Sequence, residues 1–241
     1  MSSTLKSFLG ISYIIILFIF LYLIFSYIEI TRLDDFLYYK ELQINIENNV
    51  GNNLYINILL FFLFCVVWVS LLGFGTPLLL ISGILFGKWI GTVISVTSIS
   101  IGALILYLIA NFFFKDLVYK LLEKKIINYL HLFKKNEFIY FFIFRLAGGL
   151  GIPFGLQNVL PVIFSIKKSN YFIASFLGFI PVFFIWNTIG AGLSEYIKQA
   201  DNFSILNLLL NKEIYIPILL FLILMIISII IKKKIFDGKH F

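Results

Sequence analysis

The sequence has few of the residues on which catalytic and metal sites usually depend. Among its 241 residues are one cysteine, two histidines and 12 acidic residues. The single cysteine, Cys65, excludes an intrachain disulfide, a CxxC motif and a zinc site built on cysteine. Both histidines, His131 and His240, lie in charged segments, and the chain has no HExxH or GxSxG motif and no pair of carboxylates within an apolar run. We therefore expect a protein that is not an enzyme, with no catalytic residue, metal site or cofactor.

Charge is also scarce. Only 13% of the residues are charged, 61% are hydrophobic, and the mean hydropathy is +1.03. Soluble chains carry about 25% charged residues, so this composition predicts an integral membrane protein. The net charge of +7 could indicate a nucleic-acid partner in a soluble protein. Here the lysines lie in loops between apolar runs, which is typical of positive-inside topology, and we expect no nucleic-acid partner.

The apolar runs divide the chain into spans and connections. A spanning helix needs about 20 apolar residues. The segments between the spans are predicted as a polar interfacial connection (29–53), an amphipathic surface helix (115–137) and a polar loop (195–213). The predicted fold class is all-α, with about five spanning helices at residues 7–28, 55–72, 89–114, 169–194 and 214–231.

We expect three parts along the chain. Residues 1–54 form an N-terminal span and interfacial loop, and residues 55–194 form the core. Residues 195–241 form a polar loop, a C-terminal span and a basic tail.

Residues 145–164, with the sequence RLAGGLGIPFGLQNVLPVIF, are the most informative stretch. Arg145 is the only charge in the surrounding apolar run, residues 138–166. Glycine and proline interrupt the run repeatedly, and broken backbone in a membrane is tolerated where protein covers it or where it lines a wet cavity. We interpret the stretch as a re-entrant hairpin with Arg145 at its mouth or inside it. The alternative is an ordinary kinked helix whose arginine extends to the interface.

A short internal repeat suggests a second hairpin. The pattern G-x-G-x-P occurs at residues 73–77 and 149–153, and a polar residue follows each proline five positions later, Ser82 and Asn158. Each block leads into a long span that contains glycine. We therefore predict two re-entrant hairpins related as an inverted repeat. The residues expected to shape them are Gly73, Gly75, Pro77, Gly83, Gly87, Gly149, Gly151, Pro153 and Pro161.

The distribution of basic residues fixes the expected topology. With both hairpins re-entrant and the C-terminus inside, fifteen lysines and arginines lie inside and four outside. The hairpins then enter from opposite faces. Paired interrupted segments in two halves of a membrane protein indicate a binding site near the midplane.

At these residues the chain resembles the DedA/VTT-domain family, also called the SNARE-associated Golgi protein domain, over roughly residues 73–192. The resemblance implies two opposed re-entrant hairpins and a role in lipid handling, because bacterial relatives carry polyprenyl-phosphate lipids and eukaryotic ones scramble phospholipids. The chain departs from many members in having no acidic residue between Asn48 and Asp116, Asn111 in place of an arginine, and a longer spacing from Arg145 to Pro153. The motifs that carry the resemblance are PLLLISGILFGKWIG at residues 77–91, Arg145 followed by Pro153-Phe154 and Asn158, and Phe176-Leu177-Gly178 followed by Pro181 and Gly190-Ala191.

We expect a lipid transporter of the flippase or scramblase type, in the bacterial plasma membrane with a cytoplasmic C-terminus. A charged side chain in hydrocarbon costs about 2.5–3.5 kcal/mol on insertion scales, so Arg145 is a candidate ligand for a lipid phosphate. Half-helix N-termini would add backbone N–H groups. The expected partners are membrane lipids with anionic head groups. The other residues expected to line the site are Gln157, Asn158, Ser82 and Asn187.

Several alternatives remain open from the sequence. Gln157 and Asn158 could cap a broken helix instead of contacting substrate. The protein could be an ion-coupled transporter of a small solute, although an arginine does not titrate. It could also be a membrane assembly or trafficking factor without transport activity.

Overall fold

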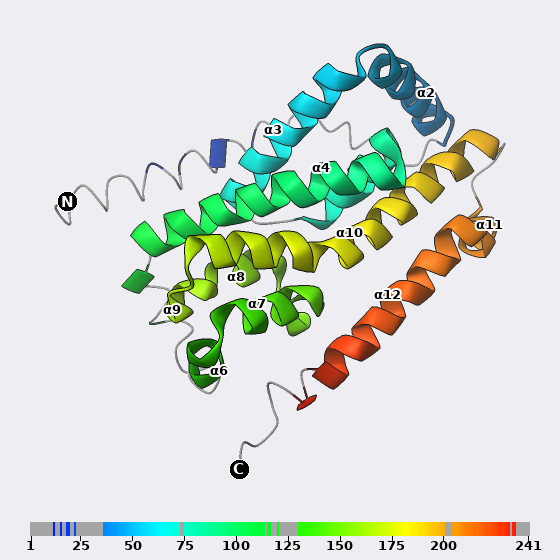
Figure 1. Cartoon of the computed structure of the whole chain (residues 1–241). Helices are drawn as coiled ribbons and strands as arrows, with labels where there is room; N and C mark the ends of the chain where they lie inside the picture. Colours follow the sequence, from blue (N-terminus) through cyan, green and yellow to red (C-terminus); the bar gives the residue numbers. More distant parts are fainter. Residues whose placement is uncertain are drawn as a thin grey trace.

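The computed structural model describes residues 36–72, 75–113, 130–200 and 204–231, with a few isolated positions outside these ranges. Every regular element in this part of the chain is helical (Figure 1). In chain order the elements are α2 (Phe36–Asn52), α3 (Leu54–Leu72), α4 (Thr76–Phe113), α6 (Leu130–Lys135), α7 (Glu137–Leu146), the 3-10 turn η3 (Gly148–Gly151), α8 (Phe154–Val159), α9 (Pro161–Phe164), α10 (Lys168–Gln199), α11 (Ile205–Leu210) and α12 (Lys212–Ile231).

The predicted all-helical membrane fold is confirmed. Four helices are long and apolar enough to cross a membrane: α3, α4, α10 and α12. They correspond to four of the five predicted spans. The fifth, residues 7–28, and most of the predicted surface helix, residues 115–137, lie outside the described residues.

The prediction of a polar loop at residues 29–53 was wrong for residues 36–52, which form α2. Side chains of α2 bind the end of α10. Gln43 Nε2 donates hydrogen bonds to the carbonyl oxygen and the hydroxyl of Ser194, at 2.8 and 2.7 Å. Lys40 Nζ donates to the carbonyl oxygen of Ala200, at 2.7 Å. These tertiary contacts stabilise a polar helix whose sequence lacks a clear apolar stripe. The predicted loop at 195–213 is likewise shorter, because α10 continues to Gln199 and α11 follows.

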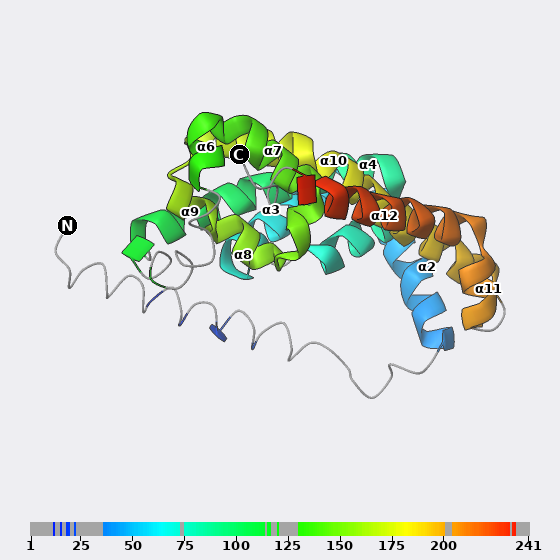
Figure 2. The ribbon, with the colours of Figure 1, turned by 90° about the horizontal axis from the view of Figure 1, so that it is seen from below.

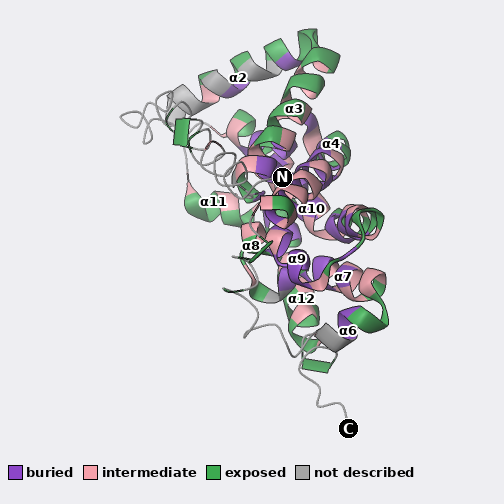
Figure 3. Cartoon of the chain, turned by 90° about the vertical axis from the view of Figure 1, so that its left-hand side faces the viewer, coloured by how far each residue is buried: buried purple, intermediate pink, exposed green. Residues whose placement is uncertain are grey.

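The helices α4 and α10 form the centre of the molecule and run antiparallel. Ser95 lies beside Asn187 near one end of the pair, and the rings of Tyr107 and Tyr171 stack near the other end, 4.6 Å apart. Figure 1 shows α3 on the side of α4 that faces away from α10, and α12 on the side of α10 that faces away from α4. Buried residues concentrate along this central pair, and α12 remains largely exposed on its outer side (Figure 3).

The chain reverses its direction inside α4, at Gly87. The hydroxyl of Ser82 donates a hydrogen bond to the carbonyl oxygen of Gly91 at 3.0 Å, although the residues are nine positions apart. Nine residues of straight helix would rise about 13 Å. Gly87 has φ +73° and ψ 176°, a conformation open to glycine, so residues 76–86 fold back against residues 88–113. We name these the short arm and the long arm of α4.

Residues 137–167 form a second reversal. The carboxylate of Glu137 accepts hydrogen bonds from the backbone N–H of Lys167, at 3.3 and 3.4 Å, so the segment returns to the level at which it began. The helix α7 runs out parallel to α10, and α8 and α9 carry the chain back beside it, as Figure 2 shows from below. Three contacts follow in the same order along α7 and α10: Glu137 with Asn170, Phe141 with Tyr171, and Arg145 with Ser175.

The two G-x-G-x-P bends meet. A Cβ atom on Gly75 would lie 3.3 Å from the ring of Phe154, the residue after Pro153. That ring in turn lies 5.6 Å from the ring of Phe179, near the middle of α10. The second bend therefore packs near the middle of α10, and the first bend packs against the second. Their entry from opposite faces of a bilayer stays a prediction.

Candidate functional site: a buried arginine beside a cavity

Arg145 occupies the centre of the second reversal. It lies in the last turn of α7, and only 1% of its surface is exposed. The side chain points inward against α10, where a Cβ atom on Gly178 would lie 2.5 Å from the Cβ of Arg145. The alternative in which this arginine extends to the membrane interface is therefore wrong, because the guanidinium is enclosed by protein.

The guanidinium is held by four neutral side chains. Its Nε donates to the hydroxyl of Ser175 at 3.2 Å, and one terminal nitrogen donates to Gln157 Oε1 at 3.4 Å. The other terminal nitrogen donates to Asn158 Oδ1 and to the hydroxyl of Tyr171, both at 2.8 Å. Rigid neighbours thus fix the direction of the donor fork.

Aromatic rings complete the enclosure. The guanidinium carbon lies 4.9 Å from the ring centre of Phe141, 4.8 Å from that of Phe179 and 5.4 Å from that of Tyr171. Contacts of this kind contribute about 0.5–2 kcal/mol each. They lower the cost of burying the charge without neutralising it.

The site carries more donors than acceptors. In the described part of the chain no carboxylate is bonded to Arg145, whose recorded partners are all uncharged. The side-chain nitrogen of Asn158 is fully buried and has no hydrogen-bond partner among the described residues. Buried charges in proteins are normally paired, because an unpaired one costs several kcal/mol. An anion in contact with Arg145 would compensate its charge.

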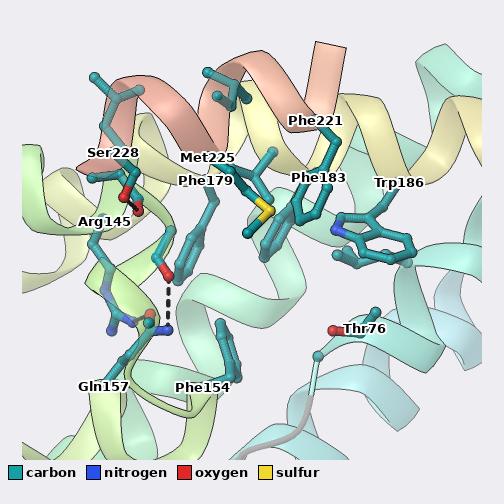
Figure 4. A pocket seen from close by; sticks show the side chains of 18 of the residues that line it. Thr76, Arg145, Phe154, Gln157, Phe179, Phe183, Trp186, Phe221, Met225 and Ser228 are labelled. Carbon is teal, nitrogen blue, oxygen red and sulfur yellow. Dashed lines mark hydrogen bonds between the residues drawn. The ribbon is translucent and has the colours of Figure 1, made fainter. Parts of the chain in front are cut away.

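A cavity of about 470 Å³ opens beside this arginine. Figure 4 shows Arg145 and Gln157 at one end and Trp186 at the opposite end, with α12 across the cavity. Both bends contribute to the wall. The cavity is lined by residues of four parts of the chain, among them Gly75 and Thr76 from the first bend, Arg145, Phe154 and Gln157 from the second reversal, Phe179, Phe183 and Trp186 from α10, and Phe221, Met225 and Ser228 from α12.

The predicted polar residues divide into two groups. Gln157 and Asn158 lie with Arg145, as the hydrogen bonds show. Of these two, Gln157 lines the cavity, whereas Asn158 is fully buried and does not; Ser82 and Asn187 are also absent from the cavity wall. They lie on either side of Gly91, where a Cβ atom would be 2.5 Å from Asn187 Oδ1 and 2.8 Å from the carbonyl oxygen of Ser82. Ser82 and Asn187 therefore belong to the packing of α4 against α10.

The residues predicted to shape the hairpins occupy three kinds of position. Gly87, Gly149 and Gly151 have positive φ angles and form reversals. Gly75 and Gly83 allow close approach, to Phe154 and to the backbone of Asn187 respectively. Gly73 lies outside the described residues. Each of the three prolines predicted to shape the hairpins lies at the start of a helix: Pro77 is the second residue of α4, Pro153 is the N-cap of α8, and Pro161 is the first residue of α9.

Sequence reasoning missed Tyr171 and Ser175. Both are fully buried on α10 and bind the guanidinium directly. Their spacing of four residues, continued by Phe179, places them on one helix face. That spacing was visible in the sequence, although nothing there tied this face to Arg145. No group of three or more histidine, cysteine, aspartate or glutamate side chains gathers in the described residues.

Two glycine substitutions should separate backbone strain from side-chain displacement. Gly149 and Gly151 have φ angles of +75° and +83°, so alanine at either position should cost about 1–2 kcal/mol. Only at Gly149 would the new Cβ collide with Gln157, 2.0 Å from its Cδ. Gln157 would then lose its bonds to the Gly148 and Ile152 carbonyls. We expect Gly149→Ala to be less stable than Gly151→Ala by roughly another 1–3 kcal/mol in detergent unfolding. Equal losses would contradict the position of Gln157.

Comparison with protein families gives one match. The model of the VTT domain matches residues 73–192, which include both bends, α4 and Arg145. No solved structure gives a significant match to the chain.

Proposed function

Because the chain belongs to the VTT-domain family of DedA-type membrane proteins, a family linked to membrane transport, we propose that it moves a phosphate-bearing lipid across the bilayer. The lipid would be a polyprenyl phosphate or a phospholipid, and the protein would act as a flippase or scramblase. The head group would enter the cavity beside Arg145 while the hydrocarbon remains in contact with apolar surface.

The observation that carries this proposal is a buried, uncompensated guanidinium on the wall of a cavity. Four of the five guanidinium N–H groups bind Ser175, Gln157, Asn158 and Tyr171, and the remaining N–H, on the nitrogen that binds Gln157, can donate to a phosphate oxygen. A phosphate would therefore satisfy charge and hydrogen bonding together, whereas a cation would leave the guanidinium unpaired.

The position of the cavity supports transport as opposed to surface binding. The second bend packs near the middle of α10, a helix long enough to cross a membrane, and the first bend contacts the second at Phe154. With α10 spanning the bilayer, the head-group site lies near its midplane, and the bends act as re-entrant hairpins from opposite faces. The basic residues then favour a cytoplasmic C-terminus and, for a bacterial chain, the plasma membrane.

A proteoliposome assay tests the proposal. Purified protein is reconstituted with a trace of a fluorescent lipid, and a membrane-impermeant quencher reports movement between leaflets. We expect faster movement of phosphatidic acid or a polyprenyl phosphate than of diacylglycerol, which has the same chains without phosphate. Protein-free vesicles give the background rate.

The same assay separates the alternatives. If correctly folded protein moves no lipid, the transport proposal fails and a role in membrane assembly or trafficking is favoured. The described residues place no carboxylate beside Arg145 that could carry a proton. Ion coupling is therefore tested separately, with an imposed proton gradient.

A further inference from the structure

We infer that the end of the cavity remote from Arg145 is a subsite for a hydrocarbon chain of the bound lipid, and that the chain enters where α12 covers α10. The inference rests on the proposed function, because it assumes that the same ligand carries the anion that pairs with Arg145. It assigns a role to residues of α10 and α12 that lie outside the polar site.

The cavity has two chemically different ends. Arg145 and Gln157 provide the polar one (Figure 4). Beyond them Phe179 and Phe183 stack at 4.6 Å beside Met225, and the opposite end closes on Trp186 and Phe221, whose rings lie 5.4 Å apart. Aromatic and thioether side chains offer adaptable apolar contacts and little hydrogen bonding. Such a surface suits hydrocarbon, and its continuity with the polar end suits an amphiphile.

The size of the cavity favours one chain over a whole lipid. A volume of about 470 Å³ falls within the usual range for ligand pockets, about 300–1,000 Å³. It accommodates a phosphate and part of one chain, and it is too small for a complete two-chain phospholipid. The remaining hydrocarbon must therefore leave the cavity into the bilayer, and a side wall must allow it to pass.

The helix α12 is that wall. Its contact with the rest of the protein is a single stripe, in which Ile214 and Pro217 are buried and Phe221, Leu224 and Ser228 are half-buried. Its other faces expose large apolar side chains such as Ile223 and Ile226. Lipid surrounds such a helix on most sides, so a chain that leaves the cavity past α12 stays in an apolar environment.

The two ends of α12 are attached differently. At its start a Cβ atom on Gly192 would lie 2.6 Å from the carbonyl oxygen of Glu213, so the backbones touch. Pro217 cannot donate to that carbonyl, which leaves one helical hydrogen bond unmade. Toward its end the described polar contact with the second reversal is a hydrogen bond from the Ser228 hydroxyl to the carbonyl oxygen of Ala147. A tight start, a proline and a lightly held end allow the far half of α12 to swing outward.

Fluorescence of Trp186 tests the subsite. Replacing Trp68 and Trp89 with phenylalanine leaves Trp186 as the only tryptophan, and the matched control keeps only Trp89, which is 69% exposed. Each protein is placed in nanodiscs that contain a small, equal fraction of phosphatidic acid or diacylglycerol with brominated chains. Bromine quenches tryptophan only at close range. We expect brominated phosphatidic acid to quench Trp186 at least twice as strongly as brominated diacylglycerol, and both lipids to quench Trp89 equally.

Equal quenching of Trp186 by the two brominated lipids overturns the subsite. If the double substitution unfolds the protein, the difference between wild type and Trp186→Phe reports the same contact. Since the measurement needs no transport, its outcome is independent of the vesicle assay. Selective quenching without transport would support the subsite and contradict the proposed function. Transport without selective quenching would support the proposed function and contradict the subsite.

Discussion

Replacing Arg145 with lysine should reduce transport of a phosphate-bearing lipid at least about tenfold, equivalent to about 1.4 kcal/mol. Lysine keeps the positive charge but concentrates it on one nitrogen with three donors. Its three donors cannot replace the bonds to Ser175, Asn158 and Tyr171 and still leave a donor for phosphate. The vesicle assay with equal amounts of reconstituted protein measures the change.

The control for this prediction is a lysine that carries the same positive charge as Arg145 but lies outside the site. Lys168, the first residue of α10, is exposed to solvent. Lys168→Ala should transport within about twofold of wild type, because screened surface charges contribute little. Transport by Arg145→Lys at the wild-type rate would mean that charge alone is needed, and the argument from donor geometry would then be lost.

Replacing Gly83 with alanine should prevent the short arm of α4 from packing against α10. The new Cβ would lie 2.2 Å from the carbonyl oxygen of Asn187 and 2.9 Å from its Cα, and neither backbone atom can rotate away. Gly190 faces the same contact from α10, where an added Cβ would lie 3.1 Å from the Cα of Gly83. Overpacking usually costs about 1–3 kcal/mol, and a clash between two backbones should reach the upper end of that range or exceed it. Thermal unfolding in detergent measures the loss.

A matched alanine substitution is available in α2. Gly51 is helical, and a Cβ there would have nothing within 4 Å. Gly51→Ala should therefore be neutral or stabilise the protein by up to about 1 kcal/mol. If Gly83→Ala unfolds at the same temperature as Gly51→Ala, the close approach of α4 and α10 is not as described.

The sequence predicted the elements whose signals are local. Apolar runs located α3, α10 and α12, and the positions of glycine and proline located both reversals, because these residues act directly on the backbone. The charge of Arg145 within an apolar run identified the site. Gln157 and Asn158 followed because they lie one helical turn beyond the second bend.

Other features depend on contacts between distant segments, which periodicity cannot reveal. Polar residues at 36–52 suggested a connection, and only the contacts of Lys40 and Gln43 with the end of α10 explain why they form a helix. Ser82 was assigned to the site because it matches Asn158 in the repeat. The two halves differ, however, since Ser82 closes the bend of α4 onto Gly91 while Asn158 binds Arg145. A repeat in sequence predicted similar backbone paths and not similar chemistry.

The central claim is that the cavity beside Arg145 binds a phosphate head group, and lipid retention measured by native mass spectrometry tests it most directly. Wild type, Arg145→Lys and Lys168→Ala are each equilibrated with phosphatidic acid and with diacylglycerol of identical chains. The account predicts that wild type and Lys168→Ala retain phosphatidic acid in preference to diacylglycerol, and that Arg145→Lys loses this preference. Retention of both lipids to the same extent by all three proteins would contradict it.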